Sequence, residues 1–251
     1  MSAFVLKIIA VVTMFMDHLG YIVFGKVSFL NCIGRLAFPI FAFQISEGYS
    51  HTRNLKKYFV RLLIFAVISQ IPYTLFISTY RENIFYPNIF FTLILGLLSI
   101  TIYENFKKKN KNLLENNHCL QIPKEQRNYK ISIQYYFNAF LGVFIPLVIM
   151  FLSELLHFDY GFFGVALIFL FHIFKNKKLL INILYILLVS IDYIIKIIEY
   201  PTYIYLRFYI FTLIPIIFIN LYNEKKGKDS KYFLYFFYPL HLILLYLLSL
   251  I

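Results

Sequence analysis

The sequence has few charged residues and no tryptophan. Asp, Glu, Lys and Arg together make up 14% of its 251 residues, whereas about a quarter of a typical soluble chain is charged. Hydrophobic residues make up 61% of the chain, against about 45–50% in soluble proteins. A soluble protein of this size could not cover such an apolar core with so few charges, and disordered and fibrous chains are excluded too. The composition predicts an integral membrane protein with several spans.

Several familiar patterns are missing as well. Two cysteines, Cys32 and Cys119, do not make a disulfide framework. No Walker loop, dinucleotide-binding fingerprint, nucleophile elbow, internal repeat or GxxxG face is present. The alternation typical of membrane barrels is absent, so the spans are expected to be helices, because the bilayer offers no water to backbone groups. The first apolar run lacks a small-residue cleavage site and is expected to be retained.

Apolar stretches of about 20 residues recur along the chain, each long enough to cross a hydrocarbon core about 30 Å thick. Nine are predicted: 4–24, 30–49, 58–79, 86–105, 133–157, 160–175, 179–198, 202–222 and 232–251. They predict an all-helical bundle of about nine transmembrane helices that forms a single domain over 1–251. A basic loop at about 106–132 is expected to interrupt it.

The basic residues are divided unevenly between the loops. The loops rich in Lys and Arg are 50–57, 106–132, 175–178 and 223–231. The other loops hold only Lys26, Arg81 and Lys196. Since cytoplasmic loops are enriched in Lys and Arg, this predicts a cytoplasmic N-terminus and a C-terminus outside. The formal net charge of +12 is then explained without a nucleic acid partner, and Cys32 and Cys119 lie on opposite sides of the membrane.

Eight polar side chains fall inside the predicted spans, where an ionisable group costs about 2.5–3.5 kcal/mol on insertion scales. Span direction converts position into depth, because each helical residue rises about 1.5 Å. All eight then lie at the middle or in the outer half of the membrane: Asp17, His18, Arg35, Gln70, Glu154, Asp192, Arg207 and His241. Their agreement in depth predicts a polar cavity that opens outward. The alternative is a set of ion pairs that lock the bundle, such as Asp17 with Arg35 or Asp192 with Arg207.

His18 is the strongest candidate for catalysis. An imidazole titrates near neutrality and can take a proton from an attacking hydroxyl or amine. Asp17 lies about 100° round the helix from His18, so Asp17 is expected to orient His18 or to hold Arg35. His241 follows Pro239, and three roles stay open for it: a second base, a substrate donor and packing. Asp17, His18 and His241 lack the spacing of metal ligands, so no metal is expected.

A second polar cluster ends the second span at the predicted cytoplasmic face. Glu47 and His51 are followed by Arg53, with Lys57 and Arg61 nearby. Such a cluster suits the phosphates of a cofactor that arrives from the cytoplasm. The alternative is ordinary anchoring of the span by basic residues.

Five stretches of the chain resemble the TraX family, which is named for a conjugation protein linked to N-terminal acetylation of pilin. They are LKIIAVVTMFMDHLG at 6–20, IGRLAFPIFAFQISEGYSHTRNLKKYFVRLLIFAVISQIPY at 33–73, NIFFTLILGLL at 88–98, DYGFFGVALI at 159–168 and YFFYPLHLILL at 235–245. The resemblance follows most spans in order and is weak over 106–157.

The same stretches are similar to the broader superfamily of transmembrane acyltransferases (acyltransferase 3-like). In that superfamily a histidine of the first span follows an arginine with ten residues between. Lys7 precedes His18 at that spacing here, so lysine replaces the arginine. Two further elements match at these positions: Gly34, Arg35, Ala37, Pro39 and Phe41 in the second span, and Tyr238, Pro239 and His241 in the last.

The resemblance implies an acyl-CoA-dependent acetyltransferase that takes acetyl-CoA on the cytoplasmic side. The acceptor would be a pilin N-terminus or a cell-envelope glycan on the other side. His18 would be the general base, Arg35 would stabilise the thioester oxygen or orient the cofactor, and Asp17 would orient His18 or Arg35. The expected contacts of the CoA phosphates are His51, Arg53, Lys57 and Arg61. The expected substrate contacts are Glu47, Asp192, Arg207 and His241.

Two other classes of function stay open. One is a transporter or an export or assembly factor for a cell-surface or conjugation substrate, and the other is a structural partner without chemistry. CoA binding would separate the enzyme from both. The abundance of Ile, Lys, Asn and Tyr is typical of an AT-rich genome, so the expected location is a bacterial plasma membrane.

Overall fold

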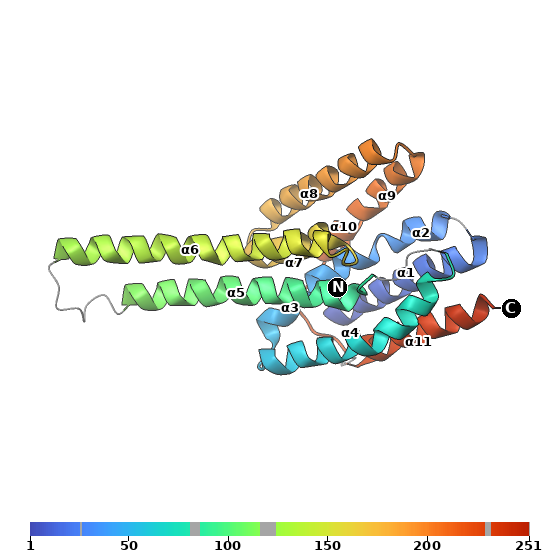
Figure 1. The fold of residues 1–251 in the computed structure, drawn as a ribbon, viewed down its shortest axis with the longest axis horizontal. Helices are drawn as coiled ribbons and strands as arrows, with labels where there is room; N and C mark the ends of the chain where they lie inside the picture. The colour runs from blue at the N-terminus through green and yellow to red at the C-terminus, as the bar shows by residue number, and fades with distance from the viewer. Residues whose placement is uncertain (26, 81–85, 116–123, 229–231, 251) are drawn as a thin grey trace.

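The computed structural model describes residues 1–25, 27–80, 86–115, 124–228 and 232–250, and these residues form helices and no strand (Figure 1). The helices are α1 (Ala3–Phe24), α2 (Phe29–Gly34), α3 (Ala37–His51), α4 (Leu55–Ile77), α5 (Ile89–Glu115), α6 (Lys124–Leu155), α7 (Gly161–Ile173), α8 (Lys178–Glu199), α9 (Tyr203–Leu213), α10 (Pro215–Asn220) and α11 (Phe233–Leu248). Cys119, Lys26 and Arg81 lie outside the described residues.

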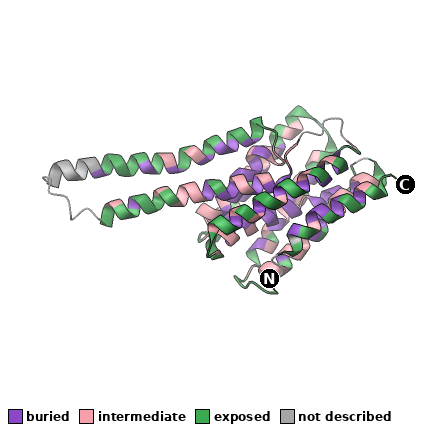
Figure 2. Cartoon of the chain, turned by 60° about the horizontal axis from the view of Figure 1, so that its bottom comes forward, coloured by how far each residue is buried: buried purple, intermediate pink, exposed green. Residues whose placement is uncertain are grey.

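Seven helical segments of the described chain are long and apolar enough to cross a membrane. Two shorter apolar helices, Gly161–Ile173 and Tyr235–Leu248, occupy the positions of the sixth and ninth predicted spans. Apolar side chains such as Val67 and Ile71 of α4 are exposed, and Figure 2 shows exposed positions along the outward faces of the helices. A multi-pass, all-helical membrane protein is confirmed, while the nine-span count and the sidedness of the termini stay predictions.

Two of the predicted spans are broken helices. The second divides into α2 and α3 at Arg35 and Leu36, which form a turn. The eighth divides into α9 and α10 at Ile214, where Pro215 occupies the first turn of α10. Proline is favoured at that position because it lacks the N–H that a helix start leaves unpaired. The first break places Arg35 where the chain turns, rather than within one straight helix.

The connections gather at two ends of the bundle (Figure 1). At one end the N-terminal residues pair with the segment after α10: the N–H of Ala3 donates to the Lys225 carbonyl over 2.8 Å, and that of Asn223 to the Met1 carbonyl over 2.9 Å. The α3–α4, α7–α8 and α10–α11 connections and the far ends of α5 and α6 also lie at this end. We call it the basic end, because the four Lys- and Arg-rich segments reach it. The α1–α2 and α8–α9 connections and the C-terminus lie at the opposite end.

Helices α5 and α6 run antiparallel and project beyond the other helices at the basic end (Figure 1). Much of the segment expected to be a loop at 106–132 is therefore helical, since α5 continues to Glu115 and α6 begins at Lys124. The buried side chains of Asn110 and Asn138 explain the difference. Nδ2 of Asn138 donates to Oδ1 of Asn110 over 2.9 Å, and Nδ2 of Asn110 donates to the Tyr135 carbonyl over 3.1 Å. These contacts between helices favour helix over loop in a polar stretch.

Candidate functional site

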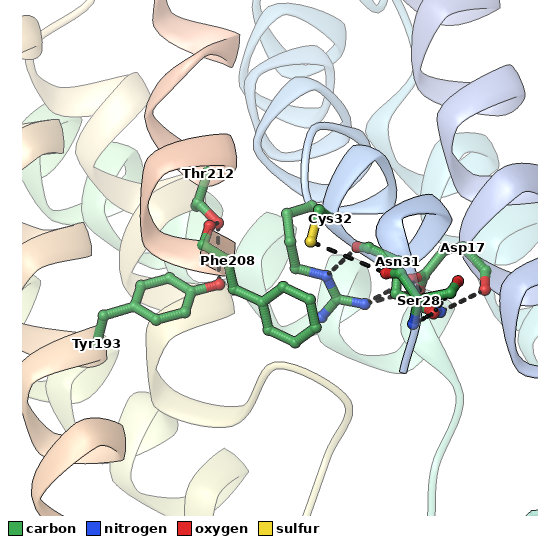
Figure 3. A network of polar contacts seen from close by, with 8 residues as sticks. Asp17, Ser28, Asn31, Cys32, Tyr193, Phe208 and Thr212 are labelled. Carbon is green, nitrogen blue, oxygen red and sulfur yellow. Dashed lines mark hydrogen bonds and ion pairs between the residues drawn. The ribbon is translucent and has the colours of Figure 1, made fainter. Parts of the chain in front are cut away.

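An ion pair joins α1 to the break between α2 and α3 (Figure 3). Nη2 of Arg35 lies 2.7 Å from Oδ1 and 2.8 Å from Oδ2 of Asp17. The two side chains are 18% and 13% exposed, respectively. One of the two locking pairs that the sequence suggested is therefore present.

Neighbouring residues make further contacts with this pair. Asn31 donates from Nδ2 to the Asp17 carbonyl over 2.7 Å and to Asp17 Oδ1 over 3.2 Å. Nε of Arg35 donates to the Asn31 carbonyl over 3.2 Å, and Oδ1 of Asn31 accepts from the backbone N–H of Ser28 over 2.8 Å. On its other side the Arg35 guanidinium lies 4.7 Å from the centre of the Phe208 ring. A buried pair with such partners is held in one geometry.

Gly34 allows α1 and α2 to approach closely enough for this pair. A Cβ atom at Gly34 would lie 2.3 Å from Cβ of Asp17, far inside van der Waals contact. Any other residue would push the two helices apart and move Arg35 away from its carboxylate. The Gly-Arg sequence at 34–35 thus has a steric reason as well as an electrostatic one.

The second element of the site is a hydrogen-bonded pair of histidines. Nδ1 of His18 in α1 lies 2.7 Å from Nε2 of His241 in α11. The two ring planes are inclined at 9° to each other, and the ring centres are 5.0 Å apart. Because the bonded nitrogens are 2.7 Å apart, they lie between the two centres, and the rings meet edge to edge. Nδ1 of His241 lies 2.9 Å from the Phe237 carbonyl, and Phe76 of α4 covers the His18 ring at a centroid distance of 4.9 Å.

The Phe237 carbonyl determines which ring nitrogens of the neutral pair carry protons. A carbonyl only accepts, so Nδ1 of His241 is the donor and its Nε2 is left as an acceptor. Nδ1 of His18 must then donate to His241, which leaves the lone pair on Nε2 of His18 unused. Within the described residues this Nε2 has no hydrogen-bond partner, and His18 is half-buried. The arrangement presents a base, because the tautomer of His18 is set by His241.

Two of the eight intramembrane polar groups have structural roles at connections between helices. Gln70 holds the segment before α5: its Nε2 donates to the Tyr86 carbonyl over 2.8 Å, and its Oε1 accepts from the Asn88 backbone over 3.0 Å. Glu154 caps α7, because its Oε2 accepts from the backbone N–H of Phe162 over 2.8 Å. A carboxylate is favoured at a helix N-terminus.

The predicted pairing of Asp192 with Arg207 is wrong. Asp192 instead pairs with Lys196 on its own helix, Oδ2 to Nζ, at 2.6 Å. Four residues separate the two, so the partner lies on the same face of α8 and is reached without any contact to α9. Arg207 is exposed on α9. Asp17 pairs with Arg35 and His18 with His241, and these two pairs form the candidate site. Gln70, Glu154 and Asp192 have partners of their own.

At the basic end, Glu47 forms an ion pair that the sequence did not suggest. Its Oε1 lies 2.9 Å from Nζ of Lys175, which follows α7. Its Oε2 is buried without a hydrogen-bond partner among the described residues. Nδ1 of His51 lies 2.9 Å from the Glu47 carbonyl. Burial and the Glu47 carboxylate raise the pKa of Tyr222, just beyond α10, to about 12, so this phenol keeps its proton at neutral pH.

A second pair at this end, Glu104 with His172, escaped sequence reasoning. Nε2 of His172 in α7 lies 3.1 Å from Oε1 of Glu104 in α5, and the same oxygen lies 3.1 Å from Nζ of Lys107. Nδ1 of His172 is buried without a partner among the described residues. The one sequence signal was that both residues are ionisable and end an apolar run.

The residues expected to bind CoA phosphates lie at or next to the α3–α4 connection, at the basic end. Arg53 and Lys57 are exposed, and Arg61 is half-buried with its guanidinium 5.6 Å from the centre of the Tyr58 ring. Along α4, Lys57 is about 28 Å from Phe76, the residue in contact with His18. A donor held by these cations would have to extend that far to reach the histidine pair.

Comparisons with known proteins add a family and two relatives. The family model described as TraX protein matches residues 2–249. A probable fimbrial assembly protein FimC, serogroup H1, of Dichelobacter nodosus is 38% identical over 112 residues, which cover 40% of this chain and 46% of that protein. An uncharacterised protein of Rickettsia prowazekii (strain Madrid E) is 26% identical over 174 residues, which cover 69% of this chain and 56% of the relative.

The chain thus spans about half the length of the curated relatives it matches. No solved structure matches. The family match extends over both helices of the histidine pair and over the Asp17–Arg35 pair. This chain belongs to the TraX family.

Proposed function

We propose that this protein serves the assembly or modification of a pilus or conjugation structure, and that its chemical step is acyl transfer with His18 as general base. The first part is supported by the TraX family match and by the relative named as a probable fimbrial assembly protein. We place the basic end in the cytoplasm of a bacterial plasma membrane, since Lys- and Arg-rich loops stay on that side. The nine apolar helices would then all span the bilayer, with the C-terminus outside.

The observation that carries the chemical proposal is the hydrogen bond between His18 and His241. It leaves Nε2 of His18 as an acceptor and fixes the direction in which that lone pair points. A general base needs its proton acceptor held in this way. His241 is then a positioning residue, and Asp17 with Arg35 holds α1 in register next to it.

The proposed step is attack on a thioester. Nε2 of His18 takes a proton from an acceptor amine or hydroxyl as its nitrogen or oxygen bonds to the acyl carbon. The carbon–sulfur bond breaks, and the thiolate that leaves takes up the proton from Nε2 of His18, which returns His18 to its neutral form. The acyl donor is acetyl-CoA, with its phosphates near Arg53, Lys57, Arg61 and His51. The acceptor is a pilin N-terminus or an envelope glycan. Of the expected substrate contacts, Arg207 is exposed and has no ion-pair partner among the described residues, whereas Glu47, Asp192 and His241 already have partners.

A deletion strain that is complemented with the wild-type protein or with its variants tests both parts at once. The measurements are the mass of the pilin-type subunit and the number of surface appendages. We expect His18→Ala to remove the acetyl mass while the protein stays in the membrane. The matched control is His157→Asn, because His157 lies outside the pair in a left-handed conformation that asparagine tolerates. An acetylated subunit in the His18→Ala cells would contradict the role of His18.

A second candidate is an assembly or export factor without chemistry. The name of the Dichelobacter nodosus relative favours it, and so does the structural use of Gln70, Glu154 and Asp192. Under this candidate, deletion of the protein lowers the number of appendages, and His18→Ala restores them to the normal number with a subunit mass equal to that of wild type. Under acyl transfer, the subunit mass differs between the His18→Ala strain and the wild type.

A further inference from the structure

The lysines of the projecting part of α5 fall into two kinds. Lys107 pairs with Glu104 at 3.1 Å and Lys111 with Glu115 at 3.6 Å, each on α5 itself. Lys108 and Lys109 have no carboxylate partner among the described residues. Two adjacent ammonium groups are thus left without counter-charges.

The same two lysines line a groove along α5 and α6, with a volume of about 400 Å³. Asn105 and Asn112 add side-chain amides to its wall. No carboxylate belongs to the wall that the described residues form. Ammonium and amide groups supply several N–H donors, which suit phosphate oxygens.

The remaining wall of the groove is apolar. Ile102 and Phe106 of α5 and Ile145 of α6 form it, and Nζ of Lys109 lies 4.8 Å from the centre of the Phe106 ring. From Ile102 to Asn112 the helix rises about 15 Å. The groove therefore changes from apolar, beside the bundle, to cationic, toward the tip of the α5–α6 pair.

This change of polarity occurs where α5 leaves its apolar segment. Glu104 and Lys107 are the first charged residues of α5, so we place Ile102 at the edge of the membrane core and the lysines at the level of the headgroups. A ligand that fits has an anionic phosphate above and a hydrocarbon chain below. Basic pockets between spans on the cytoplasmic side are known to bind anionic lipid headgroups.

We propose that this groove binds one anionic phospholipid, with its phosphate between Lys108 and Lys109 and the start of an acyl chain along Ile102 and Ile145. A soluble anion would contact the lysines but not the apolar wall of the groove. A zwitterionic lipid would bring its own cation close to two unpaired ammonium groups, which would repel it. The bound lipid would anchor the α5–α6 pair at the point where it leaves the bilayer. The assignment does not depend on the chemistry of His18.

Native mass spectrometry of the full chain released from nanodiscs tests this site. The discs contain equal amounts of phosphatidylglycerol and phosphatidylcholine. We expect retained phosphatidylglycerol on the wild type, and about 30-fold weaker retention in Lys108→Gln/Lys109→Gln, because each lysine near an anionic surface contributes about fivefold. The matched control is Lys107→Gln/Lys111→Gln, which removes the same charge outside the groove and should keep the lipid.

Three outcomes would overturn the assignment. Equal loss of lipid in both double variants would mean that only total charge matters. Equal retention of phosphatidylcholine by the wild type would mean a general layer of lipid around the protein. Release of phosphatidylglycerol by millimolar inorganic phosphate would mean a site for soluble anions. Thermal unfolding of both variants in the same discs checks that each is folded, and the exposed positions of all four lysines lead us to expect midpoints like that of the wild type.

Discussion

The two ends of the bundle hold ionisable groups in different ways. At the opposite end, both oxygens of Asp17 contact Arg35, and Asn31 links the pair to the backbone. At the basic end, the pairs of Glu47 and His172 each leave one buried atom, Oε2 and Nδ1, without a hydrogen-bond partner among the described residues. Both carboxylate oxygens of Asp17 accept hydrogen bonds from Arg35, whereas only one carboxylate oxygen of Glu47 contacts Lys175.

This difference shows where the fold relies on a charge and where it only tolerates one. Removal of one partner from a well-buried pair leaves an uncompensated charge and costs about 3–5 kcal/mol. A pair with one solvent-exposed partner costs much less to break. The side chain of Lys175 is 32% exposed, compared with 18% for Arg35. Substitutions at the two ends should therefore rank in a fixed order.

The largest effect is expected for Asp17→Ala. It strands the Arg35 guanidinium in the bundle, so the free energy of unfolding should fall by about 3–5 kcal/mol. Thermal unfolding of the detergent-purified protein measures this. The double variant Asp17→Ala/Arg35→Met removes both charges and should recover much of the loss. A double variant no more stable than Asp17→Ala would show that the pair is not the cause.

A steric probe of the same end is Gly34→Ala. The new methyl group would lie 2.3 Å from Cβ of Asp17, and such overpacking costs about 1–3 kcal/mol. Gly142→Ala is the matched control, since its methyl group would lie 3.2 Å from Cβ of Phe106 and alanine favours a helix. We expect the unfolding midpoint to fall for Gly34→Ala only. Equal falls would mean that the α1–α2 contact is not unusually tight.

A smaller effect is expected for Lys175→Met at the basic end. Glu47 loses its partner on Oε1, but Nδ1 of His51 remains 3.7 Å from its Oε2, so we expect a cost of about 1–2 kcal/mol. The measurement is the loss in free energy of unfolding for Lys175→Met and for Asp17→Ala, determined in the same series. A cost for Lys175→Met as large as that for Asp17→Ala would remove the distinction between the two ends.

The smallest effect is expected for Asp192→Asn. Its partner Lys196 is 42% exposed, so the ammonium group left behind can be hydrated, and the two residues lie on the same helix. Helix pairs of this spacing are worth about 0.3–0.5 kcal/mol. The shift in unfolding midpoint should fall within the error of the series. A loss comparable to that of Asp17→Ala would indicate that Asp192 has a partner on another helix in the membrane.

Sequence reasoning found the helices and the basic end because both depend on local composition. Apolar runs locate helices in a bilayer, and Lys and Arg mark the ends of those runs. The pairing of Asp17 with Arg35 was within reach because the two residues are 18 positions apart on consecutive segments. The partner of Asp192 was also visible as a lysine four residues on, but the wrong partner was chosen across helices.

Other features depend on contacts between distant segments. Glu104 and His172 are 68 residues apart and His18 and His241 are 223 apart, so no spacing rule joins them. The helical extension of α5 and α6 depends on Asn110, which contacts α6. A polar stretch that appears loop-like in isolation is helical because a second helix satisfies it.

The central claim is that the lone pair on His18 accepts a proton during acyl transfer. Membrane vesicles with the basic end outward would test it most directly. Radiolabelled acetyl-CoA is added outside the vesicles, and a pilin-type N-terminal peptide is enclosed inside them. We predict labelled peptide with the wild type and with His157→Asn, and a rate at least about 100-fold lower with His18→Ala, which is the usual contribution of a general base. Equal labelling by the wild type and His18→Ala, or no labelled product from any variant, would contradict it.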